Sequence, residues 1–189
     1  MELEPDTSPP VLRRIPGFKK ASKADPRYDL VRASLRFLGP ATPKQVAEYI
    51  DAPVKDVQAV WPEDVVEVTV GREKRSLLAA DEEALESAEP AVTRLLGPFD
   101  LFLQARDRST MVPDAVRAKE LWPVLGRPGA VLVDGELVGS WRPRQSGKSL
   151  RVAVNPWRKL TKTIHKGMSE QAERLAAYRG VSLGGVDVG

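Results

Sequence analysis

The chain has 189 residues, no cysteine and a single histidine, His165. This length suffices to bury a core as one large domain or two small ones. The lack of cysteine excludes disulfides, and one imidazole cannot supply a zinc site built on paired histidines, so we expect neither a metal nor another cofactor. Residues 1–20 contain no apolar run that could form a signal peptide or a membrane span, and we expect a cytoplasmic protein.

Charge is distributed unevenly along the chain, although the formal net charge is only +3. Residues 48–100 carry a net charge of −8, whereas residues 141–189 carry +7. The segment 141–168 contains eight lysines or arginines and no acidic residue. A basic face of this kind favours a nucleic-acid partner, and a solvated surface without a ligand is the alternative.

The N-terminal third predicts a flexible arm followed by three short helices. Residues 1–26 are rich in proline and cations, and this composition is too poor in apolar residues to order itself. Apolar residues recur at helical spacing over 28–38, a capping box from Thr42 to Gln45 starts a second helix, and a third helix ends before Pro62.

Residues 65–80 predict a β-hairpin, because VVEVTV alternates and Gly71 opens a turn before a second apolar run. Three helices followed by a hairpin form the winged-helix arrangement, which we assign to residues 27–80. The candidate DNA contacts of this domain are Lys55 and Gln58 on the third helix and Arg72, Lys74 and Arg75 at the hairpin tip. The alternative is a winged helix that serves only for packing or dimerisation.

An acidic connector at 81–90 leads to a second domain at 91–183, followed by a tail at 184–189. Two hairpin signals, one at Asp134-Gly135, predict at least three antiparallel strands, LFLQA at 101–105 predicts another strand, and a terminal helix follows over 161–180. The fold class is therefore α+β, with a winged helix-turn-helix and a small antiparallel sheet or barrel closed by a C-terminal helix. The candidate DNA contacts of this domain are Arg142, Arg144, Lys148 and Arg151, which could instead protect a strand edge.

The stretch GPFDLFLQARDR, residues 97–108, mixes charged and apolar side chains. Buried arginine and aspartate together commonly form ion pairs that fix the angle between two elements. We interpret Asp100, Arg106, Asp107 and Arg108 as a structural elbow rather than a catalytic pocket.

Two segments carry a resemblance to a known family. They are LRFLGPATPKQVAEYI at 35–50 and the pattern FD…RDR…VLVDGELVGSWR…LRV between Phe99 and Val152. The chain resembles, over about residues 28–180, the winged-helix DNA-binding proteins related to bacterial alkylpurine and interstrand-crosslink DNA glycosylases. The resemblance implies DNA binding by tandem winged helices and a β-barrel-like domain.

The same resemblance implies that base excision depends on a Gln-x-Gln or Gln-x-Asp motif in a preceding N-terminal module. No glutamine of this chain fits the motif, and we expect the module to be missing. The leading hypothesis is a non-enzymatic protein that binds duplex DNA mainly through phosphates. Two alternatives stay open. The first is a glycosylase-like enzyme for modified bases, or half of such an enzyme, that uses residues such as Asp100, Gln104 and Asp107. The second is an interaction module whose acidic segment 63–89 recruits a basic protein.

Overall fold

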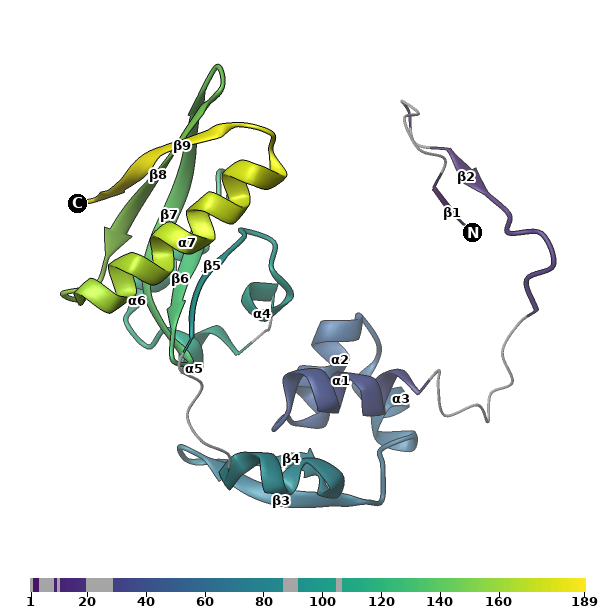
Figure 1. Ribbon diagram of the computed structural model, residues 1–189. Coiled ribbons are helices and arrows are strands. Elements are labelled where there is room, and N and C mark those ends of the chain that lie inside the picture. The colour runs from purple at the N-terminus through teal and green to yellow at the C-terminus, as the bar shows by residue number, and fades with distance from the viewer. Residues whose placement is uncertain (1, 4–8, 10, 20–28, 87–91, 105–106) are drawn as a thin grey trace.

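The computed structural model describes residues 2–3, 9, 11–19, 29–86, 92–104 and 107–189. These residues form an N-terminal helical part with a two-stranded sheet and a C-terminal part built on a five-stranded sheet (Figure 1). Two short strands near the N-terminus, β1 (Glu2–Leu3) and β2 (Leu12–Arg13), pair with each other. Much of the expected basic arm, including residues 20–26, lies outside the described residues.

Three short helices follow in the predicted order. They are α1 (Leu30–Leu38), α2 (Pro43–Ile50) and α3 (Val54–Ala59). The predicted capping box of α2 is confirmed, because Gln45 N donates to Thr42 Oγ1 over 3.2 Å and Thr42 N donates to Gln45 Oε1 over 2.8 Å. Helix α3 is shorter than predicted and leaves Val60 60% exposed, because only Val57 of its apolar residues reaches the core.

The predicted hairpin is confirmed as β3 (Val65–Val70) and β4 (Glu73–Leu78). Gly71 takes a positive φ of 64° in the turn, which a side chain would disfavour. An isolated bridge between Ala41 and Ser76 ties β4 to the segment between α1 and α2. The shared core consists of Val31, Leu35, Ala41, Val46, Ala47, Val57 and Leu78. After β4, the expected acidic connector begins as a 3₁₀ helix, η2 (Ala79–Glu86), and residues 87–90 lie outside the described range.

The larger sheet has the order β5-β6-β7-β8-β9. Its strands are β5 (Thr93–Leu96), β6 (Gly129–Val133), β7 (Glu136–Ser146), β8 (Ser149–Pro156) and β9 (Ser182–Val188). All neighbours are antiparallel except β8 and β9, which are parallel and are connected through helix α7 (Lys162–Tyr178). Residues 184–189, expected as a tail, thus mostly belong to an edge strand, and α7 is not the last element.

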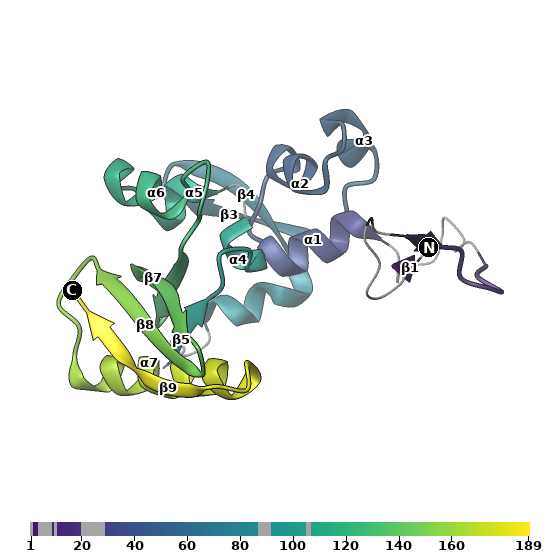
Figure 2. The same ribbon diagram turned by 90° about the horizontal axis from the view of Figure 1, so that it is seen from above.

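The two faces of this sheet carry different layers, as Figure 2 shows. Helix α7 covers one face through Ile164, Met168 and Ala172, which pack against residues such as Val131 and Val154. On the other face lie α4 (Leu101–Gln104), α5 (Arg108–Met111) and α6 (Ala115–Leu121), whose core includes Leu103, Leu121 and Ala130. Ala130 and Val131 point to opposite faces because successive strand residues alternate.

The strand predicted at LFLQA is wrong, because Leu101–Gln104 form a turn of helix. Asp100 caps this turn: its carboxylate accepts from Phe102 N over 2.9 Å, and its carbonyl accepts from Gln104 N. Such a local cap competes with a strand ladder and here outweighs the apolar alternation.

Candidate nucleic-acid interface

The β3–β4 hairpin carries three cations at or beside its tip. Two of them form ion pairs with carboxylates, and the third does not. Arg72 is exposed and has no acidic partner among the described residues. Lys74 binds Glu67 over 2.7 Å, an exposed ion pair whose hydrogen bond raises the pKa of Lys74. Arg75, expected to contact DNA, is only 8% exposed and points into the protein. Of the three candidates at the tip, Arg72 is the one that is exposed and without an acidic partner among the described residues.

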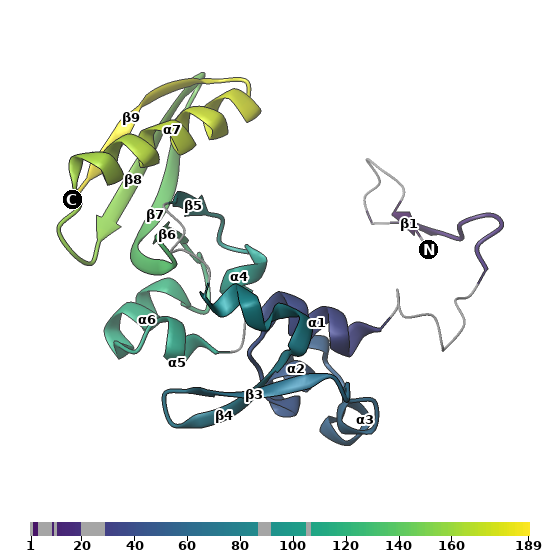
Figure 3. The ribbon, with the colours of Figure 1, turned by 60° about the horizontal axis from the view of Figure 1, so that its bottom comes forward.

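Arg75 forms a joint between the hairpin and α5, which lie beside each other in Figure 3. Its guanidinium binds Asp107 and also donates to Glu73 over 2.7 Å. Thr110 Oγ1 donates to Asp107 over 2.7 Å. Burial raises the pKa of Asp107, but the hydrogen bonds from Arg75 and Thr110 outweigh it and keep the pKa below its ordinary value. Asp107 is therefore ionised and paired at neutral pH.

The remaining residues of the expected elbow have separate surroundings. Asp100 caps α4, and Arg108 lies over the Trp122 ring with 5.1 Å between the guanidinium carbon and the ring centroid. Arg106 lies outside the described residues. Asp107 instead pairs with Arg75, which lies 32 positions earlier in the chain and outside the expected elbow.

Helix α3 exposes both of its expected contacts, Lys55 and Gln58. Asp56 is also exposed on this helix of six residues. A recognition helix normally gathers cations and amides, so the carboxylate weakens the case for base reading by α3.

The β7–β8 hairpin carries the second set of expected contacts. Arg142 and Arg144 are exposed and alternate on one face of β7, and Lys148 is exposed at the turn. Arg151 is engaged instead: its Nε donates to Asp187 Oδ2 over 2.9 Å and its Nη1 donates to the Gly184 carbonyl over 2.8 Å. The hydrogen bond to Asp187 raises the pKa of Arg151.

Arg142 and Arg144 border a hollow of about 480 Å³ on the sheet face that α6 only partly covers. Glu120 of α6 lies in this hollow and accepts hydrogen bonds from Asn155 Nδ2 over 2.8 Å, Trp157 Nε1 over 3.1 Å and the Ser140 hydroxyl. Burial raises the pKa of Glu120, and these three donors together bring it below its ordinary value. An ionised Glu120 thus anchors α6 to β7 and β8.

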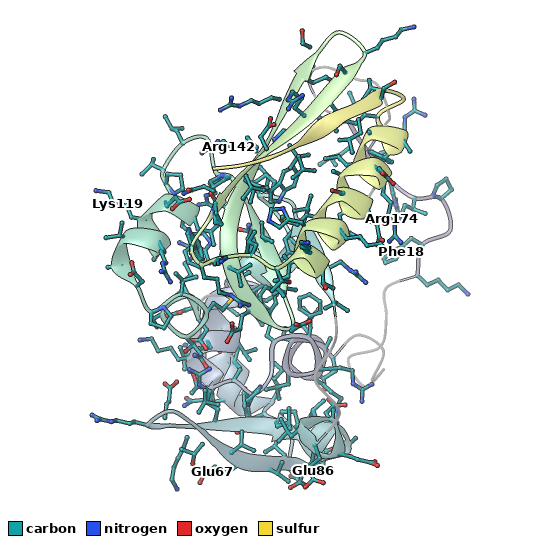
Figure 4. All side chains as sticks on the ribbon, turned by 60° about the vertical axis from the view of Figure 1, so that its left-hand side comes forward. Phe18, Glu67, Glu86, Lys119, Arg142 and Arg174 are labelled. Atoms are coloured by element: carbon teal, nitrogen blue, oxygen red, sulfur yellow. The ribbon has the colours of Figure 1, made fainter. Side chains whose placement is uncertain are left out.

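Free cations from both parts of the chain lie on one side of the molecule. In Figure 4, Lys119 and Arg142 lie to the left, and the turn of the β3–β4 hairpin points to the same side, whereas Arg174 of α7 lies to the right. Neither Lys119 nor Arg142 has an acidic partner among the described residues. We give the name cationic track to Lys119 and Arg142, together with Arg72 in that hairpin turn and Arg144, which lies two residues along β7 from Arg142.

Lys119 was missed because the sequence interpretation contained no helix at 115–121. The signal was present: Asp114 caps α6 by accepting from Val116 N and Arg117 N, and Ala118, Leu121 and Trp122 recur at helical spacing.

Several carboxylates of the acidic segment 63–89 have partners within the chain. Asp64 binds Arg32 over 2.6 Å, and Asp81 lies 3.6 Å from Arg36. Glu67 and Glu73 bind Lys74 and Arg75 as described above. The interaction-module hypothesis needs unpaired carboxylates that could attract a basic protein. These four ion pairs reduce the number of such carboxylates in the segment.

No metal site and no membrane-spanning helix are found in the described part of the chain. Its histidine, aspartate and glutamate residues do not form a group of three or more that could hold a metal ion. None of the described helices is long and apolar enough to cross a bilayer.

The fold and the site together define a mixed α+β protein that exposes cations on the β3–β4 turn, on α6 and on β7. Residues 4–178 match the family described as "DNA glycosylase AlkZ-like", and the chain belongs to that family. The relation to DNA glycosylases expected from the sequence is thereby confirmed. A comparison with curated proteins found no match.

A solved structure with a similar fold is the DNA glycosylase AlkZ of Streptomyces sahachiroi, with a TM-score of 0.68 and 22% sequence identity. The similarity covers 84% of this chain and 44% of that chain. The present chain thus spans less than half of the AlkZ protein.

Proposed function

We propose that this chain binds duplex DNA along the cationic track and so serves as the DNA-holding part of an AlkZ-like glycosylase activity. The observation that carries the proposal is that Lys119 and Arg142 lie on the side to which the β3–β4 turn, which contains Arg72, points. None of these three cations has an acidic partner among the described residues. Other arginines, such as Arg32 and Arg151, have carboxylate partners. Membership of a DNA glycosylase family supports DNA as the polyanion.

In this proposal α1, α2, α3 and the β3–β4 hairpin act as a winged helix whose wing carries Arg72. The wing contacts phosphates rather than bases, because its tip offers one free guanidinium and no amide. The joint between Arg75 and Asp107 holds the wing against α5, so that Arg72 and Lys119 can follow the same strand of DNA.

Binding of a fluorescein-labelled 20-base-pair duplex, followed by anisotropy, tests the proposal. We expect Arg72→Ala, Lys119→Ala and Arg142→Ala each to weaken binding about three- to tenfold, because each removes one phosphate contact. Arg174→Ala is the charge-matched control and should bind like the wild type, since Arg174 lies away from the track. Equal losses in all four variants, or no duplex binding at low salt, would reject the proposal.

Base excision by the chain itself is a second candidate, and family membership favours it. Of the side chains considered for catalysis, Asp107 is engaged with Arg75 and Asp100 caps α4, whereas Gln104 lines a hollow. Incubation with a duplex that contains an alkylated purine, followed by alkaline cleavage at abasic sites, tests this candidate. Strand cleavage that Gln104→Ala abolishes would support it, and no cleavage above the protein-free control would reject it.

A further inference from the structure

The loop between α6 and β6 presents two adjacent aliphatic side chains to water. Val124 is 95% exposed and Leu125 is 86% exposed, more than any other valine, leucine or isoleucine of the described residues. Neither side chain contributes to the stability of the fold through burial. We call Val124 and Leu125 the aliphatic wedge.

Both ends of this loop are anchored in the protein. Trp122 packs against the core on the α6 side of the sheet, and its Nε1 donates to the Leu103 carbonyl over 3.1 Å. Pro128 is buried at the other end. Between them, Pro123 fixes its own φ, and Gly126 has a positive φ of 66°, which a side chain would disfavour. A restrained loop holds its tip ready for a partner and loses little conformational entropy on binding.

The surroundings of the wedge favour an anionic partner. Residues 121–133 contain no acidic side chain. Lys119 is exposed just before the loop and has no acidic partner among the described residues. Glu120 is the nearest carboxylate along the chain, and it already accepts hydrogen bonds from three donors. Aliphatic side chains next to free cations suit nucleic acid, whose phosphates attract the cations and whose stacked bases offer apolar faces.

The spacing along the chain keeps the wedge close to a phosphate contact of the cationic track. Lys119 and Val124 are five residues apart, a stretch of at most about 18 Å. At about 3.4 Å per base pair, this distance corresponds to no more than about five base pairs of a duplex. A phosphate held by Lys119 and a base step reached by the wedge therefore belong to the same short segment of DNA.

We propose that the aliphatic wedge inserts between stacked base pairs of DNA bound along the cationic track. The inference rests on the proposed function, because Lys119 holds the phosphates beside the step that the wedge enters. Aliphatic wedges of DNA-binding proteins enter through the minor groove, unstack one base step and kink the duplex. Since Val124 and Leu125 carry no side-chain hydrogen-bonding group, they select steps that unstack easily rather than a base sequence.

Fluorescence of 2-aminopurine at the centre of a duplex tests the insertion, because stacking quenches this base. At saturating protein, we expect the wild type to raise the fluorescence at least about twofold and the double variant Val124→Ser, Leu125→Ser to leave it near that of free duplex. Leu85→Ser is the matched control and should give the wild-type signal, since Leu85 is 55% exposed on η2 among exposed carboxylates that repel DNA. Unfolding curves verify that each variant is folded.

The ratio of affinities for a duplex with one central mismatch and for the matched duplex measures the same insertion at equilibrium. A mismatched step is easier to unstack, so the wild type should bind the mismatched duplex about three- to tenfold more tightly. The double variant should bind both duplexes equally. Arg142→Ala should weaken binding to both and keep the ratio, because it removes a phosphate contact and no base contact.

The outcomes separate the wedge from the proposed function. Duplex binding that depends on the cationic track, without a fluorescence rise or a mismatch preference, would overturn the wedge and leave the proposed function standing. Absence of duplex binding at low salt would reject both. A wild type that is dimeric in light scattering, with a double variant that is monomeric and keeps the wild-type fluorescence and mismatch ratio, would assign the loop to contacts between two copies and overturn the wedge.

Discussion

At the scale of single residues, the contact between Arg75 and Asp107 shows that the exposure of a side chain cannot be inferred from its position in a hairpin alone. A cation beside a hairpin turn is expected to face solvent, but Arg75 is 8% exposed because a carboxylate 32 residues later meets it. The sequence interpretation placed Asp107 in an elbow with Asp100, Arg106 and Arg108, whereas the partner that the structure gives it is Arg75, and this pairing depends on how the hairpin packs against α5. The capping box of α2 was predictable because both of its hydrogen bonds are local.

The Asp107 carboxylate makes the stability of this joint depend on pH. Its pKa is below the ordinary value in the folded chain, so its contribution is present above the pKa of the unfolded chain, about 3.9, and is lost as the pH falls through the folded pKa. We expect Asp107→Asn to lower the free energy of unfolding by about 1–3 kcal/mol at pH 7, because Arg75 stays buried without its charge partner. Urea unfolding at several pH values measures this.

The gap between wild type and Asp107→Asn should narrow as the pH falls below about 4, where the wild-type carboxylate also protonates. Glu67→Gln, which removes the exposed partner of Lys74, is the matched control and should change stability little. A gap that stays constant from neutral to acidic pH would contradict the role given to Asp107.

Gly129 provides a second test at this scale. A Cβ there would collide with the Leu96 carbonyl and the indole of Trp141, whose Nε1 donates to that carbonyl over 2.8 Å. We expect Gly129→Ala to destabilise the chain by about 3 kcal/mol, because the collision involves backbone and a buried ring. Gly97→Ala is the control, since its Cβ would meet open space. Equal denaturation midpoints for the two variants would show that the sheet accommodates the methyl group.

At the scale of elements, predictions succeeded where local signals agreed with the final contacts. The β3–β4 hairpin combines alternation with a glycine turn, and both its strands form as expected. The strand prediction at Leu101–Gln104 was wrong because the hydrogen bond from Phe102 N to the Asp100 carboxylate favours a helical turn over the strand that the apolar alternation indicated. Strand β9 was missed because its parallel pairing with β8 requires α7 as the connection, and Gly184 and Gly185 lower its strand propensity.

Strand β9 supplies the prediction at this scale. We expect deletion of residues 182–189 to lower the melting temperature and to promote aggregation, because the loss exposes the edge of β8 and leaves Arg151 without Asp187. Circular dichroism melting and light scattering measure these effects. Asp187→Asn, which keeps the strand and weakens only an exposed ion pair, should melt near the wild-type temperature. A truncated chain that melts like the wild type would show that β9 is dispensable.

At the scale of the whole molecule, the sequence predicted a mixed α+β chain related to DNA glycosylases, and family membership confirms that relation. Charge segregation pointed to a polyanion, but it could not show which cations are free. That distinction needs the tertiary contacts: Arg75 and Arg151 are engaged by Asp107 and Asp187, while Lys119 comes from a helix that was not anticipated. Of the predicted contacts, Arg75 and Arg151 are therefore engaged within the chain, and the proposed track draws on cations of both parts.

The salt dependence of duplex binding tests the central claim most directly. Each phosphate contact contributes about 0.9 to the slope of log Kobs against log salt concentration. The triple variant Arg72→Ala, Lys119→Ala and Arg142→Ala should therefore bind duplex DNA with a slope about 2.7 units shallower than that of the wild type. Arg174→Ala should keep the wild-type slope. An unchanged slope in the triple variant would show that the cationic track does not contact DNA phosphates.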